Sequence, residues 1–151
     1  MKKDKITKFV ESILKLLHLK LNEKTVNLLV QIFKFVIVGG IATIIDWIIY
    51  YLFYKILNFD PLVANIFSFS VSVIYNYVAS VKWVFIVNKS KTKKKMFIEF
   101  MIFSIIGFIL TELLLWLFID LINMNEMISK IVATIIVMIF NFITRKIFLE
   151  K

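Results

Sequence analysis

Two asparagines stand inside long apolar runs at matching places in this chain. Asn76 and Asn141 are 65 residues apart, and each is followed within a few residues by cations and an aromatic side chain. A polar group in the hydrocarbon of a bilayer is costly, and it tends to face protein or a water-filled cavity. We therefore predict that Asn76 and Asn141 contact a polar ligand.

Basic residues form two groups along the same runs. Lys82, Arg145 and Lys146 stand near run ends, where a cation could bind an anion or could simply anchor a helix in the membrane interface. Lys130 stands about one turn inside an otherwise apolar run. A phosphate that leaves water needs such a cation. We predict a phosphate site at Lys130 and another at the cations near the run ends.

Further polar residues share a helix face with these groups. Asn65 is eleven residues before Asn76, close to three helical turns, so both should lie on one face, with Ser68 and Ser72 between them. These side chains could bind the ligand or hold helices together, since small residues allow close approach. The last run carries a corresponding set: Lys130, Ala133, Thr134, Val137, Asn141 and Arg145.

Two acids also stand inside apolar runs. Asp46 lies in the first run and Glu112 in the third, one position away from matching each other at an offset of 65 residues. Each acid could pair with a cation or amide of a neighbouring helix. Each could instead be a proton site that couples transport, as intramembrane carboxylates often are. Both roles stay open at the level of the sequence.

The composition indicates a membrane protein built from helices. Of the 151 residues, 61% are hydrophobic, and the mean hydropathy is +0.91. Globular domains are about 45–50% apolar. The net charge of +9 does not favour nucleic acid as a partner, because the cations flank apolar blocks, where anionic lipid headgroups are nearer.

Enzymatic chemistry is not expected from these residues. The chain has no Cys, and the sequence shows no paired-carboxylate site, no nucleophile beside a base, no Gly-rich phosphate loop and no cluster of metal ligands. We predict neither a cofactor nor a metal.

Hydropathy predicts four transmembrane helices in two hairpins. The spans are about 32–57, 62–86, 97–121 and 127–148. Short linkers join the first span to the second and the third to the fourth, so each pair should form a hairpin. We predict an amphipathic segment at 1–30 and a four-span domain at 31–151, with repeat one at 32–87 and repeat two at 97–150.

The distribution of cations predicts the orientation. Of the nineteen Lys and Arg residues, all except Lys55 and Lys130 fall at or before Lys34, between Lys82 and Lys95, or near the C-terminus. The positive-inside rule therefore places both termini and the central linker in the cytoplasm.

The N-terminal segment should form an amphipathic helix. Apolar residues recur there at helical spacing among Lys, Glu and Asn: Ile6, Phe9, Val10, Ile13, Leu14, Leu16 and Leu17. We predict a helix on the inner leaflet, with docking of a partner protein as the alternative.

The two hairpins repeat one another in sequence. A shift of 65 residues aligns Asn76 with Asn141, Trp83 with Phe148 and Asn65 with Lys130. Both units would start on the same side, so they should be related by an axis along the membrane normal. The interfacial aromatics are Trp83, Phe85 and Phe148, although Glu150 stands where Phe85 has its counterpart.

These residues carry a resemblance to a known family. The segments Phe35-x-x-Val38-Gly39, Asn76-Tyr77 running to Lys82-Trp83-Val84-Phe85, and Asn141-Phe142 with Arg145-Lys146 resemble the GtrA-like family over residues 32–150. Its members are small four-span bacterial membrane proteins implicated in moving polyprenyl-phosphate-linked sugars across the cytoplasmic membrane. The sugars then decorate teichoic acid, O-antigen or other envelope polymers.

The resemblance implies a flippase. The lipid phosphate would be held by Lys82 or Lys146 on the inner side and by Lys130 on the outer side, with Asn76 and Asn141 contacting phosphate or sugar between them. Four spans are few for enclosing a headgroup, so we expect a homo-oligomer, either a dimer or a tetramer.

Two other functions fit parts of the sequence. A small proton-coupled multidrug exporter also has four short spans, with a lone carboxylate in the first. An accessory subunit that positions a membrane glycosyltransferase would use the N-terminal helix for docking. Lys130 inside its apolar run, together with the amides of Asn76 and Asn141, favours an anionic substrate over a cationic drug.

Overall fold

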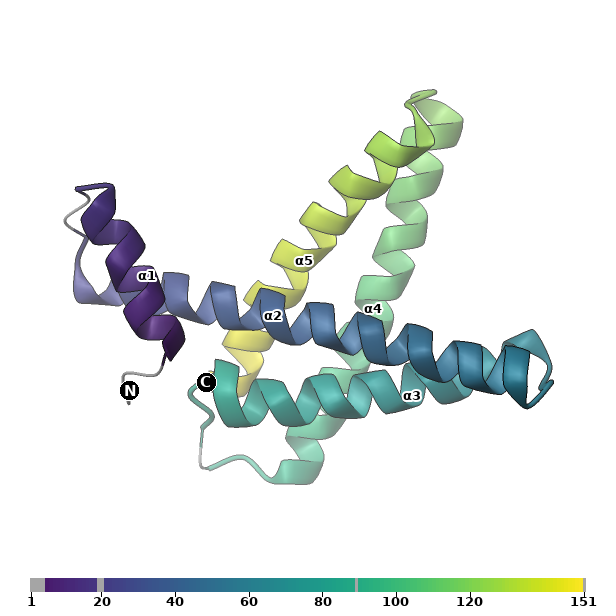
Figure 1. Cartoon of the computed structure of the whole chain (residues 1–151), viewed down its shortest axis with the longest axis horizontal. Coiled ribbons are helices and arrows are strands. Elements are labelled where there is room, and N and C mark those ends of the chain that lie inside the picture. The colour runs from purple at the N-terminus through teal and green to yellow at the C-terminus, as the bar shows by residue number, and fades with distance from the viewer. Residues whose placement is uncertain (1–4, 19–20, 89, 151) are drawn as a thin grey trace. The chain divides into compact units, whose positions relative to one another are not determined.

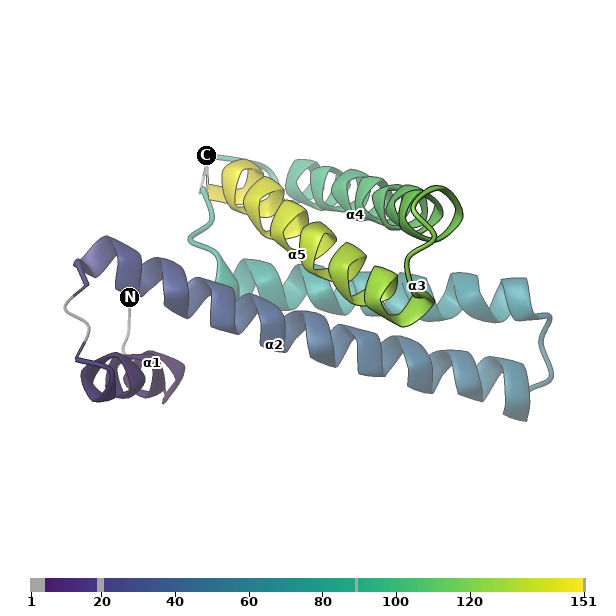
Figure 2. The ribbon, with the colours of Figure 1, turned by 90° about the horizontal axis from the view of Figure 1, so that it is seen from above.

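The computed structural model describes residues 5–18, 21–88 and 90–150. These residues form helices joined by short turns and no strands, which confirms the predicted all-α class. The chain divides into two compact units, Met1–Phe85 and Ile86–Lys151, and each is described by itself. Each unit contains one helical hairpin (Figures 1 and 2).

The first unit contains an N-terminal helix and hairpin one. The elements are α1 (Lys5–Leu16), α2 (Glu23–Tyr51), the π-helical turn η1 (Leu52–Ile56), α3 (Pro61–Ala79) and the π-helical turn η2 (Ser80–Val84). Figure 2 shows α2 and α3 running side by side, and the Phe53 ring of η1 stacks on the Phe67 ring of α3. Hairpin one is defined as Glu23–Val84.

The second unit contains hairpin two, defined as Lys93–Glu150. Its elements are α4 (Lys93–Trp116), the π-helical turn η3 (Leu117–Leu121) and α5 (Glu126–Glu150). In each hairpin the connecting turn is called the closed end, and the opposite end is called the open end.

Among the residues that the structure describes, four helices are long and apolar enough to cross a membrane, as predicted: Glu23–Ile56, Pro61–Val84, Lys93–Leu121 and Glu126–Glu150. The first is longer than its predicted span. Asn22 caps it by accepting a hydrogen bond from the Thr25 N–H at 2.8 Å, so the helix already begins at Glu23. The predicted amphipathic segment, 1–30, therefore contains α1 and also the first turns of α2.

The closed ends of the two hairpins have the same backbone design. In hairpin one the Leu57 N–H donates to the Leu52 carbonyl at 3.0 Å, and in hairpin two the Ile122 N–H donates to the Leu117 carbonyl at 3.1 Å. Both bonds close a π-helical turn. The two turns are 65 residues apart, the offset at which the sequence repeats.

The residues after each π-helical turn also correspond. Asn58 and Asn123 have left-handed backbones, with φ of 53° and 55°. Two residues later a side chain caps the next helix: Asp60 Oδ1 accepts from the Leu62 N–H at 2.8 Å, and Asn125 Oδ1 accepts from the Met127 N–H at 3.0 Å. Asparagine tolerates the left-handed region better than most residues do, which explains its use at both positions.

Small side chains line the packed faces of α3 and α5, the second helix of each hairpin. The buried stripe of α3 includes Ala64, Ser68 and Ser72, and the matching stripe of α5 includes Ser129, Ala133 and Val137. The Ser68 and Ser72 hydroxyls donate to carbonyls of their own helix at 3.1 and 3.2 Å. Their hydrogen bonds are thus made without a partner across the interface, and their small size lets the helices approach.

Aromatic pairs set the register of each hairpin. Phe53 stacks on Phe67 near the closed end of hairpin one, with ring centroids 4.9 Å apart, and Phe35 meets Phe85 at the open end at 6.1 Å. In hairpin two Phe103 contacts Phe148 at 4.4 Å. These contacts hold the polar residues described below at defined positions along each hairpin.

Candidate functional site

A buried guanidinium lies near the open end of hairpin two. Arg145 of α5 is 5% exposed, and its Cζ lies 4.0 Å from the Phe100 ring centroid. Its Nη2 donates to the Ser104 hydroxyl at 3.2 Å. A buried charge is costly unless nearby groups compensate it, and the aromatic face and the hydroxyl of α4 do so here. The sequence predicted a functional cation at this position, but not its burial.

Asn141 lies one helical turn from Arg145 and packs against a glycine of α4. A Cβ added to Gly107 would lie 2.8 Å from the Asn141 Oδ1, so a larger residue would force this amide to move. The Oδ1 atom is buried, and no described residue donates a hydrogen bond to it. Leaving a buried acceptor without a donor costs about 1–3 kcal/mol. Asn141 therefore holds a buried acceptor whose hydrogen bond no described residue makes.

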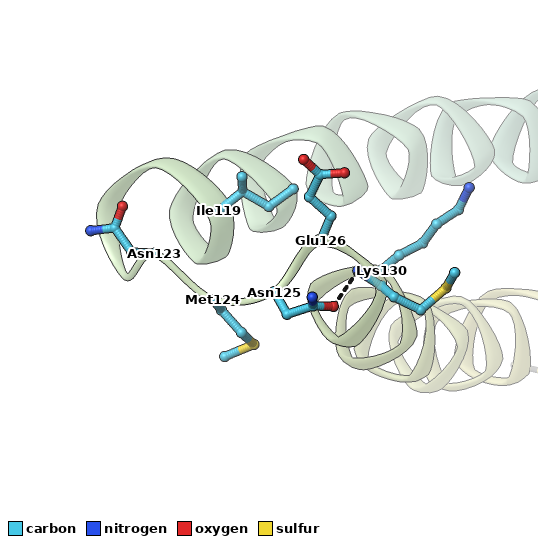
Figure 3. A pocket seen from close by; sticks show the side chains of 7 residues that line it. Ile119, Asn123, Met124, Asn125, Glu126 and Lys130 are labelled. Carbon is cyan, nitrogen blue, oxygen red and sulfur yellow. Dashed lines mark hydrogen bonds between the residues drawn. The ribbon is translucent and has the colours of Figure 1, made fainter.

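Lys130 lies at the other end of the same helix. It is exposed just after the first turn of α5 and lines a depression of about 620 Å³ at the closed end (Figure 3). The ammonium group points away from Asn123 in the turn. The other lining residues are Ile119, Asn123, Met124, Asn125, Glu126 and Met127. Eleven residues of helix, about 16 Å, separate Lys130 from Asn141 on nearly one face.

The two candidate end cations, Lys82 and Lys146, differ in their surroundings. Lys146 donates to Glu150 Oε2 at 2.8 Å, one turn along α5. The other oxygen of Glu150 accepts from the Ile86 N–H at 3.2 Å. Lys82 lies in η2 at the open end of hairpin one, and its side chain is exposed. Of the two lysines, Lys82 is thus the more accessible to an anion.

Hairpin one holds a neutral version of the Asn141 site. Asn76 is half-buried, and its Oδ1 accepts from the Ser80 hydroxyl at 3.2 Å. The position of Ser80 corresponds to that of Arg145 at the 65-residue offset. The amide is therefore present in both hairpins, whereas the buried guanidinium is present in hairpin two only.

The other residues predicted to form the polar stripe differ in their burial. Ser72 is buried against α2, whereas Asn65, the counterpart of Lys130, is exposed. The aromatic residues also differ in burial, since Phe85 is buried and both Trp83 and Phe148 are partly exposed. A single face was predicted for Asn65 and Ser72, but the neighbouring helix covers only the serine side of it.

The two acids face different environments. Asp46 is half-buried, and its Oδ1 accepts no hydrogen bond from the described part of the chain. Glu112 is exposed on α4. No ion pair joins either acid to a cation within residues 5–18, 21–88 and 90–150. Over the same residues, no group of three or more His, Cys, Asp or Glu could hold a metal ion.

Sequence reasoning missed a buried lysine in hairpin one. Lys34 is 3% exposed on α2, and its Nζ lies 5.4 Å from the Trp83 ring centroid. Gln31, one turn earlier, is equally buried. Lys34 precedes Phe35 and Val38 on the packed stripe, and this spacing was the one available signal.

Sequence reasoning also missed the docking of the central linker onto α5. Lys91 donates to Glu99 Oε2 at 3.2 Å and to the Phe148 carbonyl, and the Asn88 N–H donates to the Leu149 carbonyl at 2.9 Å. A cation at the carboxyl end of a helix offsets the negative end of its dipole. At least one linker lysine is thus used to hold hairpin two together.

These observations define a small multi-pass membrane protein that carries an amide and a buried cation inside one hairpin. The family model described as GtrA/DPMS, transmembrane domain, matches residues 34–149, and the chain belongs to this family. The resemblance seen in the sequence is confirmed.

Several relatives share most of the chain. A protein of Listeria monocytogenes called "Cell wall teichoic acid glycosylation protein GtcA" is 31% identical over 118 residues, which cover 77% of this chain and 81% of the relative. A protein of the same name from Listeria innocua serovar 6a is 30% identical over the same shares. No solved structure matches the chain.

Proposed function

We propose that this protein moves a polyprenyl-phosphate-linked sugar across the bacterial cytoplasmic membrane, for glycosylation of teichoic acid or another envelope polysaccharide. Membership of the family and the names of the relatives support a role in glycosylation. The observation that carries the proposal is the arrangement of Lys130, Asn141 and Arg145 along α5.

The proposed path uses cations at both membrane surfaces. With both termini and the central linker in the cytoplasm, Lys82 lies at the inner surface and Lys130 toward the outer one. A phosphate that moves between these surfaces needs positive charge on the way, and the guanidinium of Arg145 provides it inside hairpin two.

The amides would recognise the polar headgroup. Asn141 Oδ1 can accept from a sugar hydroxyl without losing an existing bond to a described residue. Asn76 would play the corresponding part in hairpin one, where Ser80 already donates to it. The aromatic rings of Trp83, Phe85 and Phe148 lie at the open ends, where such rings anchor a helix in the interface.

We further propose a homo-oligomer, either a dimer or a tetramer, in a membrane with anionic lipids. Glu112 is exposed near the middle of the third span. A carboxylate at that depth is costly against lipid and requires a protein neighbour or an aqueous cavity. A second copy of the chain, or a membrane glycosyltransferase, would provide that neighbour.

Transport in a defined system tests the proposal. The protein would be reconstituted in liposomes that carry a labelled prenyl-phosphate sugar, and label that becomes accessible on the other leaflet would be counted over time. We expect faster exposure of the label than in protein-free liposomes, and loss of this gain with Lys130→Gln. Equal rates with and without protein would overturn the proposal.

A second candidate is an accessory subunit that docks a glycosyltransferase. The large exposure of Phe9 and Leu16 on α1 favours it, because these side chains leave an apolar face available to a partner. Under this alternative, Leu16→Asp would lower sugar transfer in cells but leave transport in liposomes unchanged.

A further inference from the structure

The open end of hairpin one contains a buried cation beside aromatic rings. Lys34 lies over the Trp83 ring, next to the buried pair Phe35 and Phe85. Lysine is rarely buried to this extent, because its ammonium group is strongly hydrated in water. A cation beside aromatic rings, at a membrane surface, is a suitable environment for a phosphate attached to an apolar chain.

Helix α1 covers this cation. Val10 and Thr7 of α1 are buried, as are Gln31 and Lys34 of α2, and Phe9 meets Phe33 edge-on at 6.4 Å. Figure 1 shows α1 lying across the N-terminal part of α2. The last residue of α1, Leu16, and Leu17 after it are exposed, which would suit the membrane surface. The family match begins at residue 34, so α1 lies outside it.

The second unit also places a lysine on an aromatic ring, but this lysine belongs to the linker before α4 and its electrostatics differ. Lys91 lies 5.9 Å from the Phe148 ring centroid, and Phe148 is the counterpart of Trp83. The counterpart of Lys34 is Glu99, which pairs with Lys91 at 3.2 Å. The same place therefore holds a carboxylate in hairpin two and a lysine in hairpin one.

We propose that Lys34 and Trp83 form a lipid-phosphate site at the inner surface, and that α1 is a movable cover which must leave α2 before the site is occupied. The ligand is a long-chain prenyl phosphate: the phosphate contacts Lys34 and the chain contacts the Trp83 side. This inference rests on the proposed function, because it assigns the point at which the substrate enters.

Opening the cover in the full-length protein tests the inference. Val10→Asp places a charge in the contact between α1 and α2 and should release α1. Leu16→Asp adds the same charge on the exposed face of α1 and is the matched control. Binding of prenyl phosphate without a sugar would be measured for the purified protein in lipid nanodiscs through Trp83 fluorescence, with Trp47 and Trp116 replaced by Phe.

We expect Val10→Asp to bind prenyl phosphate about tenfold more tightly than the parent, and Leu16→Asp to bind no more tightly than the parent. Adding Lys34→Gln to Val10→Asp should remove this gain. Equal affinities for Val10→Asp and its parent, or a gain that survives Lys34→Gln, would overturn the site. Equal binding of inorganic phosphate in place of prenyl phosphate would also overturn it, because the proposed ligand is a lipid.

Failure of the site and failure of the proposed function give different results. Binding that depends on Lys34, together with no transport in liposomes, supports the site and overturns the function. Transport that is unchanged by Lys34→Gln, with no Lys34-dependent binding, overturns the site and leaves the function standing.

Discussion

The two hairpins share a backbone and differ in their polar interior. Each closes with a π-helical turn, a left-handed asparagine and a capping side chain at the same 65-residue offset. Inside, hairpin one pairs Asn76 with Ser80, whereas hairpin two places Arg145 on Phe100. The comparison teaches that the turn geometry can stay the same while the charge inside the hairpin differs.

A single missing carbon contributes to that difference. Gly107 of hairpin two corresponds to Ala42 of hairpin one, and a Cβ at Gly107 would collide with Asn141. Asn141 therefore packs so closely against α4 that an alanine at position 107 would force its side chain to shift. This places its Oδ1 where no described residue donates to it, whereas Asn76 accepts from Ser80.

The largest expected effect concerns the lysines at the closed ends. Lys130→Gln should lower sugar transfer to the envelope by about tenfold or more, because a charge-assisted contact is worth about 1.5–3 kcal/mol. Transfer would be measured by lectin binding to cell walls, after equal membrane insertion has been verified. The matched control is Lys55→Gln in hairpin one, another exposed lysine near a closed end. Equal losses for both variants would contradict a special role for hairpin two.

Replacing Arg145 tests whether its guanidinium is needed for transport as well as for packing. Arg145→Met should keep hairpin two folded, because an apolar side chain of similar length can replace a buried charge at little cost. Transport should nevertheless fall about tenfold. Transport in liposomes and thermal unfolding in detergent would be measured on the same preparation. Full transport by the methionine variant would show that the guanidinium is not needed.

The glycine contact should appear as a loss of stability. Gly107→Ala should lower the free energy of unfolding by about 1–3 kcal/mol, because the added carbon forces Asn141 to move. The reciprocal change in hairpin one, Ala42→Gly, should cost about 0.5–1 kcal/mol through helix flexibility alone. Denaturant titration in detergent would compare them. A smaller loss for Gly107→Ala than for Ala42→Gly would contradict the close packing of Asn141.

The smallest effects are expected at the left-handed asparagines of the closing turns, which both hairpins have. Asn58→Ala and Asn123→Ala should each cost about 1–2 kcal/mol or less, because alanine is disfavoured in the left-handed region. Replacement by glycine should cost neither hairpin this energy. Unfolding would be followed by circular dichroism. Clearly different losses for the two alanine variants would show that the closing turns are not equivalent.

The sequence predicted which segments span the membrane better than it predicted where each helix begins or which residues contact one another. Apolar length marks a transmembrane helix, and Pro61 after Asp60 marks a helix start, so the hairpin turn of the first unit was predictable. The start of α2 was missed because residues 23–30 are partly polar, although Asn22 and Thr25 formed a capping signal.

The candidate site was predictable in its residue types and less so in its geometry. The pairing of Lys146 with Glu150 follows from their spacing of four on one helix. The burial of Lys34 depends on α1, and the contact of Gly107 with Asn141 joins two helices. Such contacts require a known register between helices, which hydropathy and periodicity do not provide.

The docked linker has a consequence for ancestry. Asn88 and Lys91 hold the chain before α4 against the carboxyl end of α5, so hairpin two begins and ends in one place. A unit whose entry and exit lie together can be fused to a copy of itself through a few residues. A tandem gene duplication of such a hairpin would thus need only a short connector between the two copies.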